Sequence, residues 1–179
     1  FYKFKKLKIK IPKYTLSNLH KESDLFFDWY LKYFLKNKKI SKTKKILKSE
    51  LNKVYKKLNY KNNTFVHRDF HASNIMINKK GIGLIDSQDA IIGNPLYDVV
   101  SLIDDVRIKL PINLQNKFLK FYHLKSKLKR EKFENLKNDY DILSVQRNFK
   151  ILGIFVRLSK RDKKSTYLKY LPYTWRLIN

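Results

Sequence analysis

The sequence predicts an α+β fold that is mostly α-helical, with one small β unit near the middle of the chain. Gly and Pro number only four each in 179 residues, so the residues that end helices and form turns are scarce. Most segments carry apolar residues at helical spacing, whereas residues 64–85 carry short apolar runs around a turn. The length suits one domain with a substantial core.

Two amphipathic helices are expected before the β unit. The first is predicted between Glu22 and Lys36 by four aromatic residues at helical spacing, namely Phe26, Trp29, Tyr30 and Tyr33. The second follows an i, i+4, i+7, i+8, i+11 series, formed by Leu47, Leu51, Val54, Tyr55 and Leu58. Ser41 or Thr43 is the expected N-cap of the second helix.

The β unit is predicted as a short strand at Phe65-Val66 and a hairpin. Ile75–Ile77 and Ile82–Ile85 form its strands, joined by a turn over residues 78–81. The numbers of paired residues in an antiparallel ladder have a constant sum, and this turn sets the sum near 159 or 160. Asn74 is therefore expected opposite Ile85 or Asp86.

Four further helices are expected after Pro95. They cover Asp98–Val106, a segment capped by Asn113, Tyr140–Leu158 and Thr166–Ile178. The third is the most apolar and is expected in the centre of the core, and Pro172 is expected to interrupt the last.

The composition excludes several kinds of site. Cysteine is absent, which excludes a disulfide framework, a thiolate nucleophile and a thiolate metal site. No uncharged run approaches the roughly 20 residues that span a bilayer. Phe1 to Lys10 alternates lysine with apolar residues, unlike a signal peptide. We expect a soluble, cytoplasmic protein with no membrane partner.

The formal net charge is +26, which suits nucleic acid, an anionic surface or an anionic substrate. Only seven of the 41 basic residues are Arg, and the lysines are spread through every segment. Dispersed lysine is typical of a solvated surface, and this interpretation is favoured over a nucleic-acid site.

Three side chains around the predicted hairpin have the chemistry of phosphoryl transfer. Asp69 lies on the loop that enters the hairpin, where it could orient a substrate hydroxyl or accept its proton. Asn74 and Asp86 offer two hard oxygen ligands at one hairpin end, which suit Mg²⁺ together with water and phosphates. Each residue alone could simply bind its local backbone, but the convergence of all three favours a functional site.

The motif around these residues resembles those of a known family. H-x-D-x-x-x-x-N spans His67 to Asn74, and I-D-x-x-D spans Ile85 to Asp89. Both are similar to the catalytic and metal-binding motifs of the aminoglycoside phosphotransferase/choline kinase family of protein-kinase-like enzymes. The flanking residues resemble the branch that phosphorylates the anomeric hydroxyl of N-acetylmuramate and N-acetylglucosamine in cell-wall recycling. The resemblance covers nearly the whole chain, but only the C-terminal lobe of the family.

The resemblance implies ATP and Mg²⁺ as cofactors and a small sugar as substrate. It implies that Asp69 is the catalytic base and that Asn74 and Asp86 are the magnesium ligands. Ser87 stands where the family usually has an aromatic residue, a departure that removes no oxygen ligand.

Four further residues are expected to support the site. His67 would brace the catalytic loop, and Asp89 matches the second acid of the family pattern. Asp98 resembles a residue that ties its helix to the loop, although a simple acid at a helix N-terminus is an alternative. For His71 two roles stay open, contact with a ligand and support of the local structure.

Substrate contacts are expected from helices that would wall the acceptor pocket in this fold. The candidates are Trp29, Tyr30, Gln146 and Arg147. Aromatic residues at helical spacing usually belong to a core, so Trp29 and Tyr30 are expected there, while a functional role is favoured for Arg147.

Kinases of this fold also need an N-terminal β lobe with a Lys, a Glu and a loop over the phosphates. Only 64 residues precede the β unit, they are predicted to be helical, and no Gly occurs before Gly81. We expect residues 1–179 to form the C-terminal lobe, with the nucleotide-binding lobe lost or on a separate chain. The isolated chain is expected to be poorly active.

Two alternatives remain open from the sequence. One is another small-molecule kinase of the same superfamily, acting on an aminoglycoside, choline or a similar alcohol. The net charge of +26 favours an anionic acceptor such as N-acetylmuramate over a polycation. The other is a non-catalytic, basic nucleic-acid-binding protein, for which the sequence offers no recognisable motif.

Overall fold

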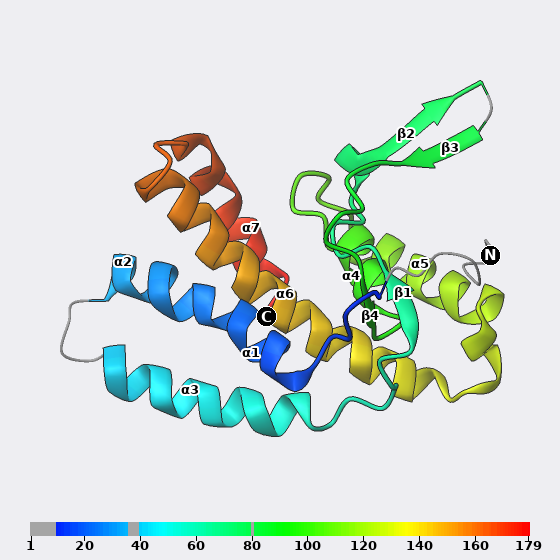
Figure 1. Cartoon of the computed structure of the whole chain (residues 1–179), viewed down its shortest axis with the longest axis horizontal. Coiled ribbons are helices and arrows are strands. Elements are labelled where there is room, and N and C mark those ends of the chain that lie inside the picture. The colour runs from blue at the N-terminus through cyan, green and yellow to red at the C-terminus, as the bar shows by residue number, and fades with distance from the viewer. Residues whose placement is uncertain (1–9, 36–39, 80) are drawn as a thin grey trace.

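The computed structural model describes residues 10–35, 40–79 and 81–179 (Figure 1). This part of the chain is mostly helical and contains two small antiparallel sheets, which confirms the predicted α+β class. Residues 1–9 of the segment tested for a signal peptide lie outside the described residues, as do Lys36 and Lys80. No described helix is both long and apolar enough to cross a membrane.

Two helical stretches precede the strands, as predicted. The first runs without a break through α1 (Leu16–Leu25), a π-helical segment (Phe26–Leu31) and α2 (Lys32–Phe34). It begins six residues before Glu22, because Thr15 and Asn18 cap each other. The Thr15 side chain accepts from the Asn18 N–H at 3.3 Å, and Asn18 Oδ1 accepts from the Thr15 N–H at 2.8 Å. Such a capping box stabilises a helix by about 1 kcal/mol.

The second stretch is α3 (Ile40–Tyr55). The N-cap prediction was wrong, since Ile40 is already helical and Ser41 and Thr43 therefore lie inside the first turn. Leu51 and Tyr55 are its buried residues, and they belong to the apolar series that predicted the helix.

The predicted hairpin is formed by β2 (Ile75–Asn78) and β3 (Gly81–Leu84). Ile75 pairs with Leu84, so the residue numbers sum to 159, one of the two expected registers. Asn74 consequently lies opposite Ile85, and the Ile85 N–H donates to the Asn74 carbonyl at 3.1 Å.

A second sheet pairs β1 (Thr64–Val66) with β4 (Ile91–Gly93). The sequence analysis missed β4, because a three-residue apolar run carries no periodicity of its own. The N-terminal segment also reaches β4: the Tyr14 N–H donates to the Ile92 carbonyl at 2.8 Å, and the Ile92 N–H donates to the Pro12 carbonyl at 2.9 Å.

The four predicted downstream helices are present as α4 (Tyr97–Ile103), α5 (Ile112–Lys125), α6 (Phe133–Lys160) and α7 (Leu171–Arg176). Asn113 is not the cap of α5, because the helix begins at Ile112 and Pro111 holds the cap position. Pro172 is the second residue of α7 rather than an interruption within a helix, since its missing N–H is tolerated in a first helical turn.

The long helix α6 crosses the whole molecule (Figure 1). Its 28 residues extend for about 42 Å, and it packs against α1, α4, α5 and α7. The prediction that this helix is central is therefore confirmed, although the helix extends further at both ends than its apolar pattern indicated.

The crossing of α1 and α6 depends on Gly153. A Cβ atom at this position would lie 2.2 Å from the backbone carbon of Leu25 and 2.6 Å from the backbone nitrogen of Phe26. Both are backbone atoms and cannot rotate away. The two helices thus touch through their main chains where the π-helical segment begins.

We expect Gly153→Ala to lower the free energy of unfolding by about 2–3 kcal/mol, because the added methyl group must force the two helices apart. Urea unfolding followed by circular dichroism measures this change. Gly83→Ala is the matched control, since a Cβ there meets nothing within 4 Å, and it should stay within about 0.5 kcal/mol of wild type. Equal stability of the two variants would contradict the close packing.

Candidate active site

The loop between β1 and β2 carries Asp69 and Asn74 in one hydrogen-bonded turn. The Asp69 carbonyl accepts from the His71 N–H at 3.0 Å and from Asn74 Nδ2 at 2.9 Å. Residues Ala72–Asn74 form a 3₁₀ turn that delivers Asn74, which is buried, to the start of β2. Because the amide nitrogen of Asn74 is engaged, its side-chain oxygen is the atom left for a ligand.

Asp98, at the start of α4, holds the preceding part of the loop. Its carboxylate accepts from the backbone N–H groups of His67 at 2.7 Å and Arg68 at 3.0 Å. Burial raises the pKa of Asp98, although these two N–H groups act in the opposite direction. The buried His67 ring then contacts the Ile85 carbonyl through Nε2 at 3.0 Å, which joins the loop to the segment that follows β3.

Two residues of this region have left-handed backbone conformations. Arg68 has a φ of 71° and Asp86 a φ of 68°, a conformation that costs a non-glycine residue on the order of 1 kcal/mol and is found disproportionately at functional sites. Arg68 directly precedes Asp69, and Asp86 is itself a predicted ligand. The surrounding hydrogen bonds offset this cost at Arg68.

A divalent metal ion near Asn74 and Asp86 would be held by few protein atoms. No group of three or more His, Cys, Asp and Glu side chains that could hold a metal occurs in the described part of the chain. Asn74 and Asp86 offer one amide and one carboxylate oxygen. Asp86 is exposed and makes no hydrogen bond or ion pair with another described residue. Amide and carboxylate oxygens are of the kind that Mg²⁺ binds together with waters and phosphate oxygens.

His71 lies near charges of both signs, those of Arg107 and Asp105 among them. Burial and then the charge of Arg107 lower the pKa of His71, which favours the neutral ring. The segment after α4 supports this turn, since the Ala72 N–H donates to Asp105 Oδ2 at 3.3 Å and Arg107 reaches Ser73 Oγ at 3.5 Å.

Glu22 of α1 joins four parts of the molecule through its buried carboxylate. Its Oε1 atom contacts the guanidinium of Arg68 at 2.5 Å and the ammonium of Lys150 at 3.2 Å. Its Oε2 atom accepts hydrogen bonds from three further side chains at 2.7–3.1 Å, those of Tyr14, Tyr97 and Gln146. The loop that carries Asp69 is thereby fixed to α1, α4 and α6.

The charges around Glu22 set its protonation. Burial alone would raise the pKa, but Lys150, the Tyr14 hydroxyl and Arg68 outweigh this effect and lower the pKa of Glu22 to about 2. The sequence analysis missed this residue. A signal was present, because Glu22 stands three residues after Leu19 and four before Phe26, on the face of the helix that is buried.

Asp69 lies at a pocket of about 480 Å³ between α1 and α6. The helices contribute Asn18, Lys21, Glu22, Leu25, Lys150, Ile154 and Arg157, and the loops contribute Arg68, Asp69 and Asp89. The Asp89 carbonyl is also 3.4 Å from Arg68 Nη1. The structure thus brings Asp69 and Asp89 to one concave, strongly charged surface.

The four predicted substrate residues do not line this pocket. Gln146 is fully buried and donates to Glu22, and Arg147 is buried and donates to Ser101 Oγ at 2.6 Å. Tyr30 stacks on Phe26. Trp29 packs against the hydrophobic core.

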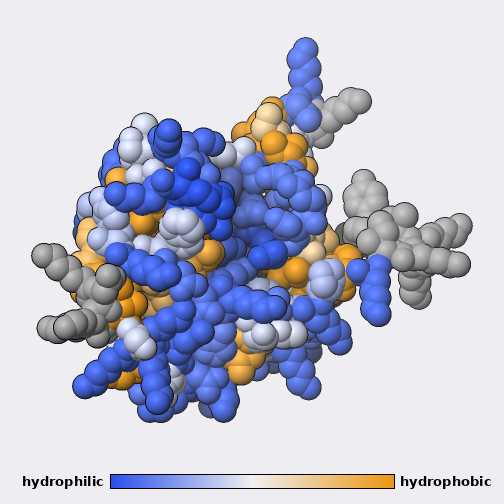
Figure 2. Space-filling model, turned by 60° about the vertical axis from the view of Figure 1, so that its left-hand side comes forward, coloured by the Kyte–Doolittle hydropathy of each residue, from blue (hydrophilic) through white to orange (hydrophobic). Residues whose placement is uncertain are grey.

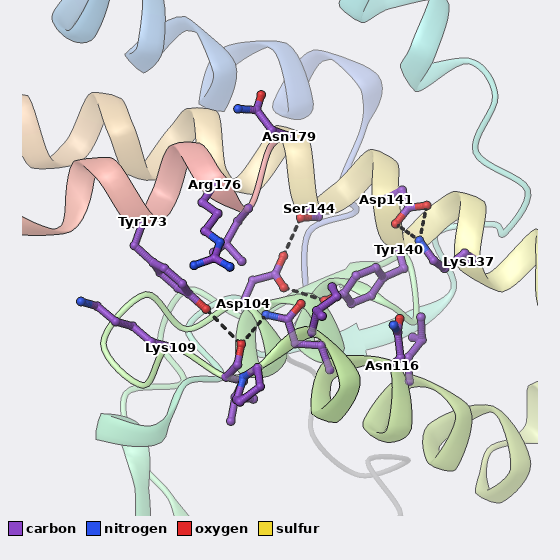
Figure 3. Close-up of a pocket in the computed structure, with 16 residues that line it drawn as sticks. Asp104, Lys109, Asn116, Lys137, Tyr140, Asp141, Ser144, Tyr173, Arg176 and Asn179 are labelled. Carbon is purple, nitrogen blue, oxygen red and sulfur yellow. Dashed lines mark hydrogen bonds and ion pairs between the residues drawn. The ribbon is translucent and has the colours of Figure 1, made fainter.

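A second pocket of about 590 Å³ lies between α5, α6 and α7 (Figure 3). At its centre, the buried carboxylate of Asp104 accepts hydrogen bonds from Tyr140 at 2.6 Å and Ser144 at 2.5 Å. Asp69, Asn74 and Asp86 are not among its lining residues. None of the other predicted site residues lines this pocket either.

Comparison with known proteins places this site in a family. Residues 15–134 match the model of the phosphotransferase enzyme family (APH), which is more than half of the chain. The chain therefore belongs to this family, and the resemblance in its motifs is confirmed.

Three relatives are named N-acetylmuramate/N-acetylglucosamine kinase. The chain is 31% identical to that of Pseudomonas aeruginosa over 94% of this chain and 51% of the relative. It is 28% identical to that of Neisseria meningitidis, over 90% of this chain and 50% of the relative, and 28% identical to that of Pseudomonas putida, over 94% and 51%. The chain spans about half the length of the curated relatives it matches.

We expect acid to remove the stabilisation that Glu22 provides. A carboxyl with a lowered folded-state pKa stabilises the fold above its unfolded pKa, and the effect is lost as the pH falls through the folded value. Between about pH 5 and pH 2, wild type should lose about 3 kcal/mol more than Glu22→Gln. Urea unfolding at stepped pH measures this difference.

The matched control is Glu50→Gln, whose exposed side chain pairs with Lys53 on the same helix. This variant should follow the wild-type pH dependence, because exposed pairs contribute little. Parallel curves for wild type and Glu22→Gln would contradict the role of the buried carboxylate.

Proposed function

We propose that the chain catalyses transfer of the γ-phosphoryl group of ATP to a sugar hydroxyl, as one part of a kinase. The observation that carries this proposal is the hydrogen bond from Asn74 Nδ2 to the Asp69 carbonyl. It fixes the proposed base and a proposed metal ligand in one short turn, next to a pocket of about 480 Å³. Phosphoryl transfer depends mainly on such positioning.

Asp69 orients the acceptor hydroxyl and takes up its proton as the oxygen bonds to the phosphorus and the bond to ADP breaks. Asn74 and Asp86 would hold Mg²⁺, which would neutralise charge on the phosphate oxygens. His67 and Asp98 position the loop, while His71 and Asp89 support the reacting groups.

The acceptor we propose is an amino sugar, phosphorylated at its anomeric hydroxyl. The names of the relatives from three bacterial species support this substrate class. The reaction would return cell-wall sugars to metabolism in the cytoplasm, where ATP is available. Gln146 and Arg147 would act indirectly, through Glu22 and Ser101.

We further propose that residues 1–179 form the C-terminal lobe of a protein-kinase-like fold. The relatives are about twice as long as the matched region, which leaves room for a nucleotide-binding lobe in them. The hairpin supports this arrangement, because Ile75, Ile77, Ile82 and Leu84 alternate onto one face of the ladder.

This hairpin face is largely uncovered. Ile77 is 84% exposed and Ile82 is 75% exposed, and Figure 2 shows apolar residues gathered on the projecting hairpin. An apolar face next to Asn74 suits contact with a second lobe and with the flat ring of a purine.

We expect Asp69→Asn to abolish catalysis without unfolding the chain. The assay requires a complete site, so the N-terminal half of the P. aeruginosa relative is joined to this chain, and sugar-dependent formation of ADP is measured. The substitution should lower kcat about 10²- to 10⁴-fold, the typical contribution of a catalytic base.

Asp28→Asn is the matched control, because Asp28 is a half-exposed carboxylate that pairs with Lys44 on α3. It should retain the kcat of the joined protein. The 179-residue chain alone should turn over poorly, and appreciable sugar-dependent ADP formation by it would contradict the two-lobe proposal.

We expect replacement of Ile77 and Ile82 together by Thr to raise the KM for ATP about tenfold in the joined protein, a loss of about 1.4 kcal/mol. Unfolding of the 179-residue chain should hardly change, because both side chains are exposed. Ile46→Thr, at a 52% exposed position on α3, is the control. An unchanged KM for ATP would count against nucleotide contact at the hairpin.

A further inference from the structure

The pocket beside Asp69 is lined by four basic side chains, those of Lys21, Arg68, Lys150 and Arg157. Two of them already share one carboxylate. Arg68 and Lys150 both pair with the Glu22 carboxylate, at 2.5 Å and 3.2 Å. The two remaining cations, Lys21 and Arg157, make no ion pair with a described residue.

Arg157 is the more informative of the two. It is only half-exposed, and its Nε atom is buried without a hydrogen-bond partner among the described residues. Buried donors are nearly always paired, because an unpaired one loses its interaction with water without replacement. Because Arg157 also lines the pocket, the accessible part of its guanidinium group can bind an acceptor group from outside the chain.

The position of Arg157 along α6 suggests how a ligand would lie. Lys150, Ile154 and Arg157 share one face of the helix, with Arg157 about 10 Å beyond Lys150. Lys150 touches Glu22, which in turn touches Arg68, the neighbour of Asp69. The catalytic carboxylate and the unpaired guanidinium thus belong to different ends of the pocket.

We propose that Arg157, assisted by Lys21, binds a carboxylate of the acceptor sugar and so makes the site selective for acidic over neutral sugars. This inference rests on the proposed sugar-kinase function. The planar guanidinium binds a carboxylate through two parallel hydrogen bonds. Asp69 and Asp89 repel the same carboxylate, so the acid group turns toward Arg157 and a hydroxyl turns toward Asp69.

N-acetylmuramate and N-acetylglucosamine form a suitable pair of probes, because the former carries a carboxylate that the latter lacks. Binding of each sugar to the 179-residue chain is measured by titration calorimetry or by NMR. Wild type should prefer N-acetylmuramate. Arg157→Gln should reduce this preference about tenfold or more, as expected for the loss of a charged hydrogen bond.

Arg161→Gln is the matched control, one helical turn further along and paired with the neighbouring Asp162. It should keep the wild-type preference. Lys21→Gln, at an exposed position, should reduce the preference by a smaller factor, and it tests the same idea if Arg157→Gln fails to fold.

The outcomes separate the two proposals. Equal binding of both sugars by wild type, or an equal loss of both in Arg157→Gln, overturns acid selectivity and leaves sugar phosphorylation standing. Binding of neither sugar overturns both the selectivity and the proposed acceptor. Phosphorylation by the joined protein that Asp69→Asn abolishes would still support the kinase function in that case.

Discussion

The buried carboxylate of Glu22 is the interaction on which the arrangement of the candidate site depends. A charge removed from water is tolerated only when its partners are complete, and loss of one partner leaves the others uncompensated. Here Arg68 and Lys150 supply opposite charge, and three further donors complete the shell. Because Arg68 belongs to the loop that carries Asp69, the position of the proposed base follows from charge neutralisation in the interior.

The helix α6 contributes several of the contacts that hold the candidate site. Near its start, Asp139 of α6 accepts hydrogen bonds from the backbone of Asn59 and Tyr60, which fixes the chain entering β1. Further along, α6 contributes Lys150 to the Glu22 cluster and Gly153 to the crossing with α1. The helix α6 therefore joins the chain before β1 to the Glu22 cluster, while α1 and α4 hold the loop itself through Glu22 and Asp98.

Features with local causes could be predicted from the sequence. The hairpin depends on a short turn and two apolar runs, which limited its register to two choices and the partner of Asn74 to Ile85 or Asp86, and the motif residues were visible as a pattern. The strand β4 and the partners of Glu22 could not be predicted, because they depend on contacts between distant segments. Gln146, for example, lies 124 residues from Glu22, and its helical spacing gave no sign that it faces a buried carboxylate rather than a ligand.

The main-chain contact at Gly153 has a consequence for how acceptor preference can change in this family. Side chains adjust by rotation, but two touching backbones do not, so the end of the pocket near Leu25 has a fixed width. Substitutions at positions such as Lys21 and Ile154 can alter the charge and shape of the pocket without widening its end near Leu25. If this pocket evolved to accept other alcohols, the side chains at its entrance would therefore change while its width stayed nearly constant.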